Sequence, residues 1–278
     1  MPIAYVLAAL LSAILHAGWN AAVKASPDPT RAMAGQMLVS ALIAVPILAW
    51  AGLPATGAWP WMAASTLMNV ASVAALLRAY ASAGFGVAYP IARAVSVLLV
   101  VPLAAAIAGE TLSLTALLGI GLITLSLAIL SLGAGADKGL SPTALLWTLV
   151  AGVTTAGYVL CDAQGVRQSG SAWAYGALVS ILNAAAMSWR IRHLGSPVAH
   201  VRATWAVAVP AAVAAMASYL IILWVWTRAP IAAATALRDT SAVFAVLIAV
   251  LWLREPLGWH RIAAVLLAAA AVPLLRAG

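Results

Sequence analysis

Residues 93–112 read RAVSVLLVVPLAAAIAGETL, and residues 238–257 read RDTSAVFAVLIAVLWLREPL. A shift of 145 residues aligns them and places Arg93 on Arg238. Arginine and glutamate are scarce in this chain, so their matches carry more weight than matches of Ala or Leu. The two stretches therefore indicate an internal repeat. The matched pairs are Arg93 and Arg238, Ser96 and Ser241, Val101 and Val246, Ala104 and Ala249, Glu110 and Glu255, and Leu112 and Leu257.

A second alignment joins the start of the chain to its middle. At a shift of 139 residues, Ala17-Gly18-Trp19 falls on Ala156-Gly157-Tyr158, and Leu7 falls on Leu146. The pairing of glycine with an aromatic residue is the informative part of this match. The repeat therefore extends beyond one helix and covers both halves of the chain.

The composition is that of a membrane protein. Of the 278 residues, 65% are hydrophobic and only 7% are charged, whereas soluble domains carry about 25% charged residues. A water-exposed surface needs more charge than this chain has. The apolar runs are continuous rather than alternating, which excludes a β-barrel.

The hydropathy pattern predicts an all-α membrane protein with ten transmembrane helices. Each helix needs about 20 apolar residues, so ten helices use about 200 residues and leave only short loops and tails. Gly, Pro or charged residues bound each span. The spans are expected at about 3–23, 32–52, 59–82, 87–108, 113–133, 142–163, 172–189, 204–227, 231–252 and 258–275.

Each copy of the repeat holds five spans, one copy in residues 1–138 and the other in residues 139–278. Five is an odd number, so the second copy enters the membrane from the opposite side. The halves are therefore expected to be inverted repeats. In proteins of this kind the substrate site lies between the halves, near the midplane of the bilayer.

Three predicted helices carry a stripe of polar side chains. Polar residues recur every four positions in the first span, which places them on one face of a helix. An ionisable side chain is costly in lipid, so we expect these stripes to line a central cavity. The residues are Ser12, His16, Asn20 and Lys24 in the first span, Tyr89, Arg93 and Ser96 in the fourth, and Arg238 and Ser241, with Asp239 and Thr240 beside them, in the ninth.

Some of these residues also have a purely structural interpretation. Arg93 and Arg238 could reach an interface with their long side chains, or pair with Asp162, at the end of the sixth span, or with Asp239. His16 could simply hydrogen-bond to a neighbouring helix.

Four further residues lie at informative positions. Trp19 and its repeat mate Tyr158 are either walls of the cavity or packing residues. Glu110 and Glu255 lie at helix ends, where each is expected to cap the helix that follows it. We do not expect either glutamate to contact a substrate.

Several motifs resemble the EamA family of the drug/metabolite transporter superfamily. Gly109-Glu110-Thr111-Leu112, followed by Gly119-Ile120-Gly121, resembles the junction of the family's fourth and fifth helices. Arg254-Glu255-Pro256-Leu257 repeats this motif in the second half. His16-Ala17-Gly18-Trp19-Asn20, with Lys24, is similar to the first helix of one EamA subgroup.

The resemblance implies a ten-helix carrier of metabolites, often an exporter of amino acids, in a bacterial-type plasma (inner) membrane. Two arginines suit an anionic group such as a carboxylate, because guanidinium offers a planar fork of donors. Aromatic residues suit an apolar side chain. An amino acid fits both requirements.

Two alternative functions remain at this stage. A multidrug exporter of lipophilic cations would carry a glutamate in its first helix, as the small multidrug resistance relatives do, but this first span has none. A non-transporting membrane scaffold would not need three polar stripes.

Other classes of protein find no support in the sequence. We expect no enzymatic activity and no cofactor, because no catalytic constellation or phosphate-binding loop is present. The single cysteine, Cys161, does not make a thiolate metal site, so no metal is expected. A net charge of +8 reflects basic loops rather than nucleic-acid binding. The expected partners are a small-molecule substrate and the lipid bilayer.

Without a nucleotide-binding motif, transport must be facilitated or driven by an ion gradient. His16 is the preferred proton-coupling candidate, because imidazole changes its charge near neutral pH. Asp239 is the second candidate, although we expect it to hold Arg238 in place.

Orientation has two competing predictions. The excess of basic residues in odd-numbered loops places those loops in the cytoplasm, whereas the family resemblance places both termini there. The odd-numbered loops hold Lys24, Arg31, Lys138, Arg190, Arg192, Arg202, Arg254 and Arg261, and the even-numbered loops and C-terminal tail hold Arg167, Arg228 and Arg276.

Overall fold

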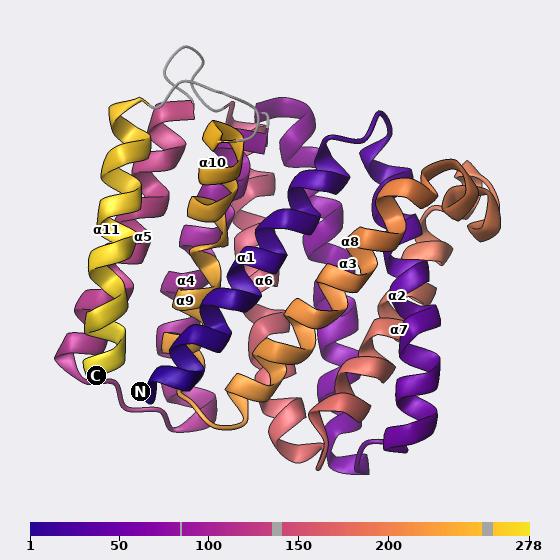
Figure 1. Ribbon diagram of the computed structural model, residues 1–278, viewed down its shortest axis with the longest axis horizontal. Coiled ribbons are helices and arrows are strands. Elements are labelled where there is room, and N and C mark those ends of the chain that lie inside the picture. Colours follow the sequence, from indigo (N-terminus) through magenta and orange to yellow (C-terminus); the bar gives the residue numbers. More distant parts are fainter. Residues whose placement is uncertain (84, 135–140, 252–257) are drawn as a thin grey trace.

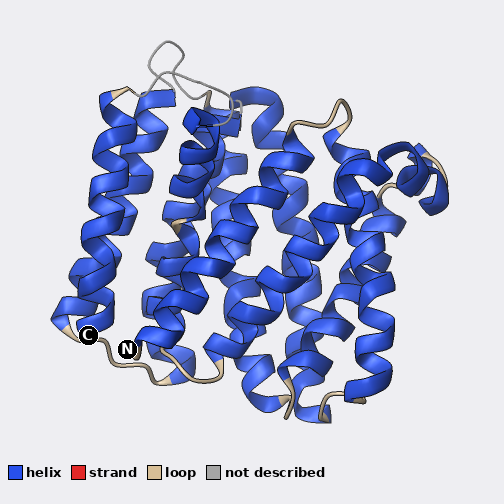
Figure 2. Ribbon diagram, viewed as in Figure 1, coloured by secondary structure: helices blue, strands red, loops and turns tan. Residues whose placement is uncertain are grey.

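The computed structural model describes residues 1–83, 85–134, 141–251 and 258–278. These residues form an all-helical bundle in which no strand occurs (Figures 1 and 2). The all-α membrane fold expected from the sequence is confirmed. The helices are α1 (Ile3–Lys24), α2 (Pro29–Ala51), α3 (Trp59–Ala83), α4 (Phe85–Ala108), α5 (Leu114–Ala134), α6 (Pro142–Gln168), α7 (Ala172–Arg190), α8 (Pro197–Trp226), α9 (Ile231–Asp239), α10 (Ser241–Leu251) and α11 (Trp259–Ala277), with 3₁₀ turns η1 (Thr56–Ala58) and η2 (Arg192–Leu194).

Within the described chain, nine segments are long and apolar enough to cross a membrane. The remaining predicted span, residues 172–189, is α7, which is a regular helix of 19 residues. It is less apolar than the others because it carries Tyr175, Ser180 and Asn183. It packs closely against α2.

The ninth predicted span, 231–252, consists of two helices rather than one. α9 ends at Asp239 and α10 begins at Ser241, with Thr240 between them. The Thr240 hydroxyl donates to the carbonyl of Leu237 at 2.6 Å. A threonine hydroxyl that bonds to the preceding turn offers the backbone an alternative to a continuous helix, and this contact accompanies the break.

Short polar residues begin several helices. Asp28 accepts a hydrogen bond from the amide of Arg31 at 3.0 Å, and Ser171 accepts one from Ala174 at 3.2 Å. Such N-caps satisfy amides that lack a partner within the helix. Proline occupies the first turn of α2, α6 and α8, where its missing N–H costs nothing.

Helices from the two halves of the chain pack in reciprocal pairs. α1 packs on α8, and α6 packs on α3. α4 lies against α6, just as α9 and α10 lie against α1. The pairs α2–α7 and α5–α11 join equivalent helices of the two halves. The N- and C-termini lie at the same end of the bundle (Figure 1).

The outer surface is apolar, as lipid contact requires. Large side chains such as Leu42, Leu67 and Leu266 are more than half exposed. The interior, in contrast, contains buried histidine, arginine and aspartate side chains. The ionisable groups of the spans therefore face inward and not the lipid.

Candidate functional site

A cavity of about 410 Å³ lies between the two halves of the chain. Helices α1 to α4 and α6 to α9 all contribute to its wall. It reaches the surface where α1 ends and α2 begins, because the exposed residues Lys24 and Pro29 line it. The sequence-predicted residues that line it are His16, Trp19, Asn20, Lys24, Tyr89, Arg93, Tyr158 and Arg238.

Five sequence-predicted residues do not line this cavity. The buried residues behind its wall are Ser12, Ser96, Asp239, Thr240 and Ser241. Among the described residues, the Ser96 and Ser241 hydroxyls have no hydrogen-bond partner. Ser96 and Ser241 therefore occupy equivalent positions in the helix packing, and neither of them lines the cavity.

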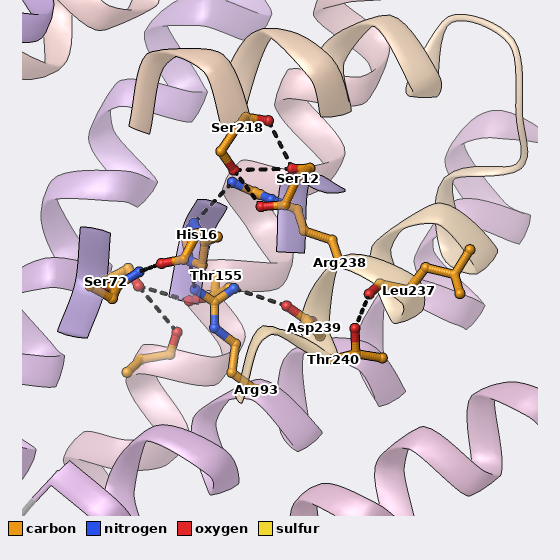
Figure 3. A network of polar contacts seen from close by, with 12 residues as sticks. Ser12, His16, Ser72, Arg93, Thr155, Ser218, Leu237, Arg238, Asp239 and Thr240 are labelled. Carbon is orange, nitrogen blue, oxygen red and sulfur yellow. Dashed lines mark hydrogen bonds and ion pairs between the residues drawn. The ribbon is translucent and has the colours of Figure 1, made fainter. Parts of the chain in front are cut away.

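Arg93 is held between Asp239 and His16 (Figure 3). Its Nη1 forms an ion pair with Asp239 Oδ1 at 3.0 Å, and its Nη2 lies 2.8 Å from His16 Nε2. Arginine only donates hydrogen bonds, so His16 Nε2 must accept. The imidazole is then neutral and carries its proton on Nδ1.

The sequence paired Asp239 with the adjacent Arg238, but the carboxylate lies against Arg93 instead. Consecutive side chains on a helix point about 100° apart. Asp239 therefore faces α4, while Arg238 faces the cavity. The ion pair joins the two halves of the chain.

Arg238 is differently placed from its repeat mate. Its Nη2 is 3.5 Å from His16 Nδ1, and because that nitrogen carries the imidazole proton, the contact joins two donors. The guanidinium carbon lies 5.9 Å from the centre of the Trp226 ring, and Nε has no partner. No carboxylate of the described chain pairs with Arg238.

Two aromatic residues shape the wall near this cluster. The rings of Trp19 and His16 meet edge to face at 5.1 Å. The Arg93 guanidinium lies 5.1 Å from the centre of the Tyr89 ring, a cation–π distance. Asn20 donates to the His16 carbonyl at 2.8 Å, within its own helix. Trp19 and Tyr89 are thus both wall and packing residues.

Asp162 is a cavity residue that the sequence pattern did not reveal. The pattern predicted that the sixth span ends near Asp162, but α6 continues for six more residues to Gln168. The side chain is buried and lines the cavity. The polar residues Gln164 and Arg167 made the span look shorter, although Gln164 is itself buried.

Asp162 accepts hydrogen bonds from three hydroxyl groups. Ser65 and Tyr175 donate to Oδ1 at 2.5 and 3.1 Å, and Tyr219 donates to Oδ2 at 2.9 Å. These donors come from α3, α7 and α8. Asn69 and Asn183 also line the cavity, and their amide oxygens lack partners within the described chain.

Glu110 caps a helix, though not the one that follows it in sequence. It accepts hydrogen bonds from the amide of Ile231 at 2.7 and 2.8 Å, at the N-terminus of α9. Arg167 also donates to it at 3.0 Å. Gly109, with φ of 64°, makes the turn that precedes it. Its repeat mate Glu255 lies outside the described residues.

The fold and the cavity together define a class: a multi-pass α-helical membrane protein with a polar chamber between its two halves. The model of the EamA-like transporter family matches residues 142–277. The match to this family thus lies in the second half of the chain, as the sequence motifs indicated.

Other comparisons concern the fold alone. A solved structure described as "Crystal structure of protein" has a TM-score of 0.72 at 17% identity. The match covers 97% of this chain and 94% of that one. A search of curated proteins finds no match.

Proposed function

We propose that this protein is a secondary transporter that exports a small polar metabolite with an anionic group, such as an amino acid. The observation that carries the proposal is Arg238, a buried guanidinium that lines the cavity and has no carboxylate partner within the described chain. A buried charge without a partner is costly. A ligand carboxylate would supply the missing interaction with a planar pair of oxygens.

The division into two inverted repeats, residues 1–138 and 139–278, is part of this proposal. The reciprocal packing of α1–α8 and α6–α3 supports it. So do two similar serine-to-carbonyl hydrogen bonds between these helices: Ser218 donates to the Ser12 carbonyl at 2.8 Å, and Ser72 donates to the Ala151 carbonyl at 3.4 Å. The shift of 139 residues places Ala151 on Ser12.

The proposed mechanism is alternating access in the inner membrane of a bacterial-type cell. The cavity is open where α1 meets α2, and its far end lies near Asp162 and Tyr219. Rocking of one repeat against the other would open the opposite face. No step in this cycle requires covalent chemistry or a cofactor.

Transport of labelled amino acids by protein in proteoliposomes tests the proposal. We expect saturable flux in the wild type and at least a tenfold loss in Arg238→Gln. The matched control is Arg202→Gln, because Arg202 is exposed and outside the cavity. Equal flux in both variants would contradict the proposal.

A second candidate, the export of lipophilic cations, gains support from Asp162. The sequence argued against this function because the first span has no acidic residue. In the structure, however, an acidic residue of α6, Asp162, lines the cavity. Arg238 in the same cavity opposes it, because it would repel a purely cationic ligand. Flux of a lipophilic cation in the same vesicles separates the two candidates.

A further inference from the structure

Two buried charges of opposite sign line the cavity without an ion-pair partner among the described residues. Arg238 has none, as described above, and Asp162 has none among the described residues either. Both side chains are buried and line the same chamber. Arg93, which also lines the chamber, is paired with the buried Asp239, so these two charges cancel. The cavity therefore has two opposite poles of charge.

We propose that Asp162 is the binding site for a cationic nitrogen, so that the cavity selects zwitterions held between Asp162 and Arg238. This inference rests on the proposed function and deepens it, because it assigns a role to a residue that the anion-binding argument does not use. A carboxylate bound at Arg238 leaves an ammonium group to be satisfied elsewhere in the same chamber.

The surroundings of Asp162 suit an ionised carboxylate. Ser65, Tyr175 and Tyr219 all donate hydroxyl protons to it. An ionised carboxylate is a pure acceptor with room for about four hydrogen bonds, and three are occupied. The 2.5 Å contact from Ser65 is typical of a hydroxyl bonded to a charged oxygen. The charge is thus stabilised without being neutralised.

One acceptor position of the Asp162 carboxylate remains open on the side that faces the cavity. Oδ1 receives two hydrogen bonds and Oδ2 receives one, from Tyr219. Tyr219 lines the cavity together with Asp162, whereas Ser65 and Tyr175 do not. The two outer donors therefore hold the carboxylate from behind, and Oδ2 is the oxygen available to a ligand.

The position of Tyr175 is fixed by close packing. A Cβ placed on Gly165 would lie 2.5 Å from the Tyr175 hydroxyl oxygen. Only a glycine at this position of α6 allows the ring to reach Asp162. Support of this kind keeps a binding group in place before the ligand arrives.

The apolar part of the wall indicates the rest of the ligand. Pocket-lining side chains of α2 and α3 include Met33, Met37, Val73, Leu76 and Leu77. They provide a surface for an aliphatic or aromatic group. An α-amino acid with an apolar side chain combines the three features: a carboxylate, an ammonium and an apolar group.

Equilibrium binding to the purified full-length chain in lipid nanodiscs tests the inference. The ligands are leucine, 4-methylpentanoate, which lacks only the ammonium, and 3-methylbutylamine, which lacks only the carboxylate. We expect the wild type to bind leucine at least tenfold more tightly than either analogue. Asp162→Asn should weaken the binding of leucine at least tenfold and leave the binding of 4-methylpentanoate unchanged.

Tyr219→Phe provides a second variant in case Asp162→Asn fails to fold. It removes only the hydroxyl that donates to Oδ2, so leucine should bind more weakly while 4-methylpentanoate does not. The selectivity of the wild type among the three ligands decides the question without any variant.

The outcomes separate this inference from the proposed function. If 4-methylpentanoate binds the wild type as tightly as leucine, or if leucine does not bind, the inference is overturned. If 3-methylbutylamine binds as tightly as leucine, the cavity is a cation site and the inference also falls. Amino-acid flux without charge selectivity would leave the transport function standing. Selective binding without flux would leave the inference standing and overturn the transport function.

Discussion

Two arginines that the repeat places at equivalent positions have different roles at the scale of single residues. Arg93 is neutralised by Asp239, whereas Arg238 faces the cavity without a carboxylate partner in the described chain. The sequence predicted that both lie in polar stripes that line a central cavity. The structure thus separates an arginine held in a buried ion pair from the one that we propose binds the ligand.

Removal of one partner from the buried Arg93–Asp239 pair should destabilise the fold. We expect Arg93→Gln to reduce the free energy of unfolding by about 3–5 kcal/mol, because an uncompensated buried charge remains. The double variant Arg93→Gln/Asp239→Asn should recover much of this loss. Thermal unfolding in detergent measures both. A double variant less stable than the single one would contradict the assignment of the pair.

His16 is expected to act as a neutral acceptor for Arg93. His16→Gln retains an acceptor oxygen and should melt near the wild-type temperature, whereas His16→Leu should melt at a lower temperature because Arg93 Nη2 loses its partner. Thermal unfolding of the two variants provides the comparison. Equal melting temperatures would show that this contact contributes little.

The same geometry makes His16 a poor proton carrier. A second proton would place a third cation between Arg93 and Arg238 and leave Arg93 Nη2 without an acceptor. We therefore expect any response of uptake to a pH gradient in proteoliposomes to survive in His16→Gln. Loss of the response in that variant would restore the role that the sequence suggested.

The lining residues were predictable from the sequence to a limited extent. The four-residue period of α1 and the repeat identified His16, Asn20 and both arginines, because spacing fixes which side of a helix a residue occupies. The partner of Asp239 and the place of Asp162 were not predictable. Both depend on which helices lie side by side, and spacing within one helix does not contain that information.

At the scale of elements, close helix crossings rather than polar groups fix the distance between neighbours. Gly152 of α6 lies against α4: a Cβ there would be 2.6 Å from Val95 Cγ1 and 2.9 Å from the Ala92 carbonyl oxygen. Ala92 precedes Arg93 in the chain. The crossing thus determines where Arg93 enters the cavity.

Gly152→Ala should therefore push α4 away from α6. We expect it to lower the free energy of unfolding by about 1–3 kcal/mol, the usual cost of overpacking. Gly121→Ala is the matched control, because nothing lies within 4 Å of a Cβ there. Thermal unfolding of the two alanine variants gives the comparison. If Gly152→Ala is as stable as the control variant, α4 can shift to accommodate the added methyl group without a loss of stability.

Glu110 joins the turn after α4 to the N-terminus of α9 and to Arg167. Glu110→Gln removes the negative charge that interacts with the helix amides and the guanidinium, so the melting temperature should fall. Asp28→Asn is the control: this acid also caps a helix, but its side chain is 48% exposed. We expect a smaller shift in the control. A larger one would argue against the cap on α9.

In the described chain, the α1–α2 and α7–α8 connections lie at one end of the bundle and both termini lie at the other (Figure 1). This arrangement requires an even number of crossings, and so it requires α7 to span the bilayer despite its polar residues. The sequence predicted the ten spans well because lipid imposes long apolar runs. It did not predict the break at Thr240, since no Gly or Pro marks it.

Topology reporters test this arrangement. Cysteines introduced at Gly52 and Gly278, in a background without Cys161, should react with an impermeant reagent from the same side of the membrane. A cysteine at Gly195 should react from the opposite side. Reaction at Gly52 and Gly195 from one side and at Gly278 from the other would mean that α7 does not cross. The same labelling of intact cells decides between the two predicted orientations.

The Arg93–Asp239 pair has no counterpart at the equivalent place. The shift of 145 residues that aligns the two arginines places Asp239 on Ala94, and the shift of 139 places Asp162 on Val23. Both buried acids thus belong to the second half alone. Two separate copies of a single five-helix chain could not form such a chamber, because any acid added to one would appear in both. Covalent fusion permits electrostatic asymmetry: one arginine is paired with a buried aspartate, and its repeat mate has no carboxylate partner in the described chain.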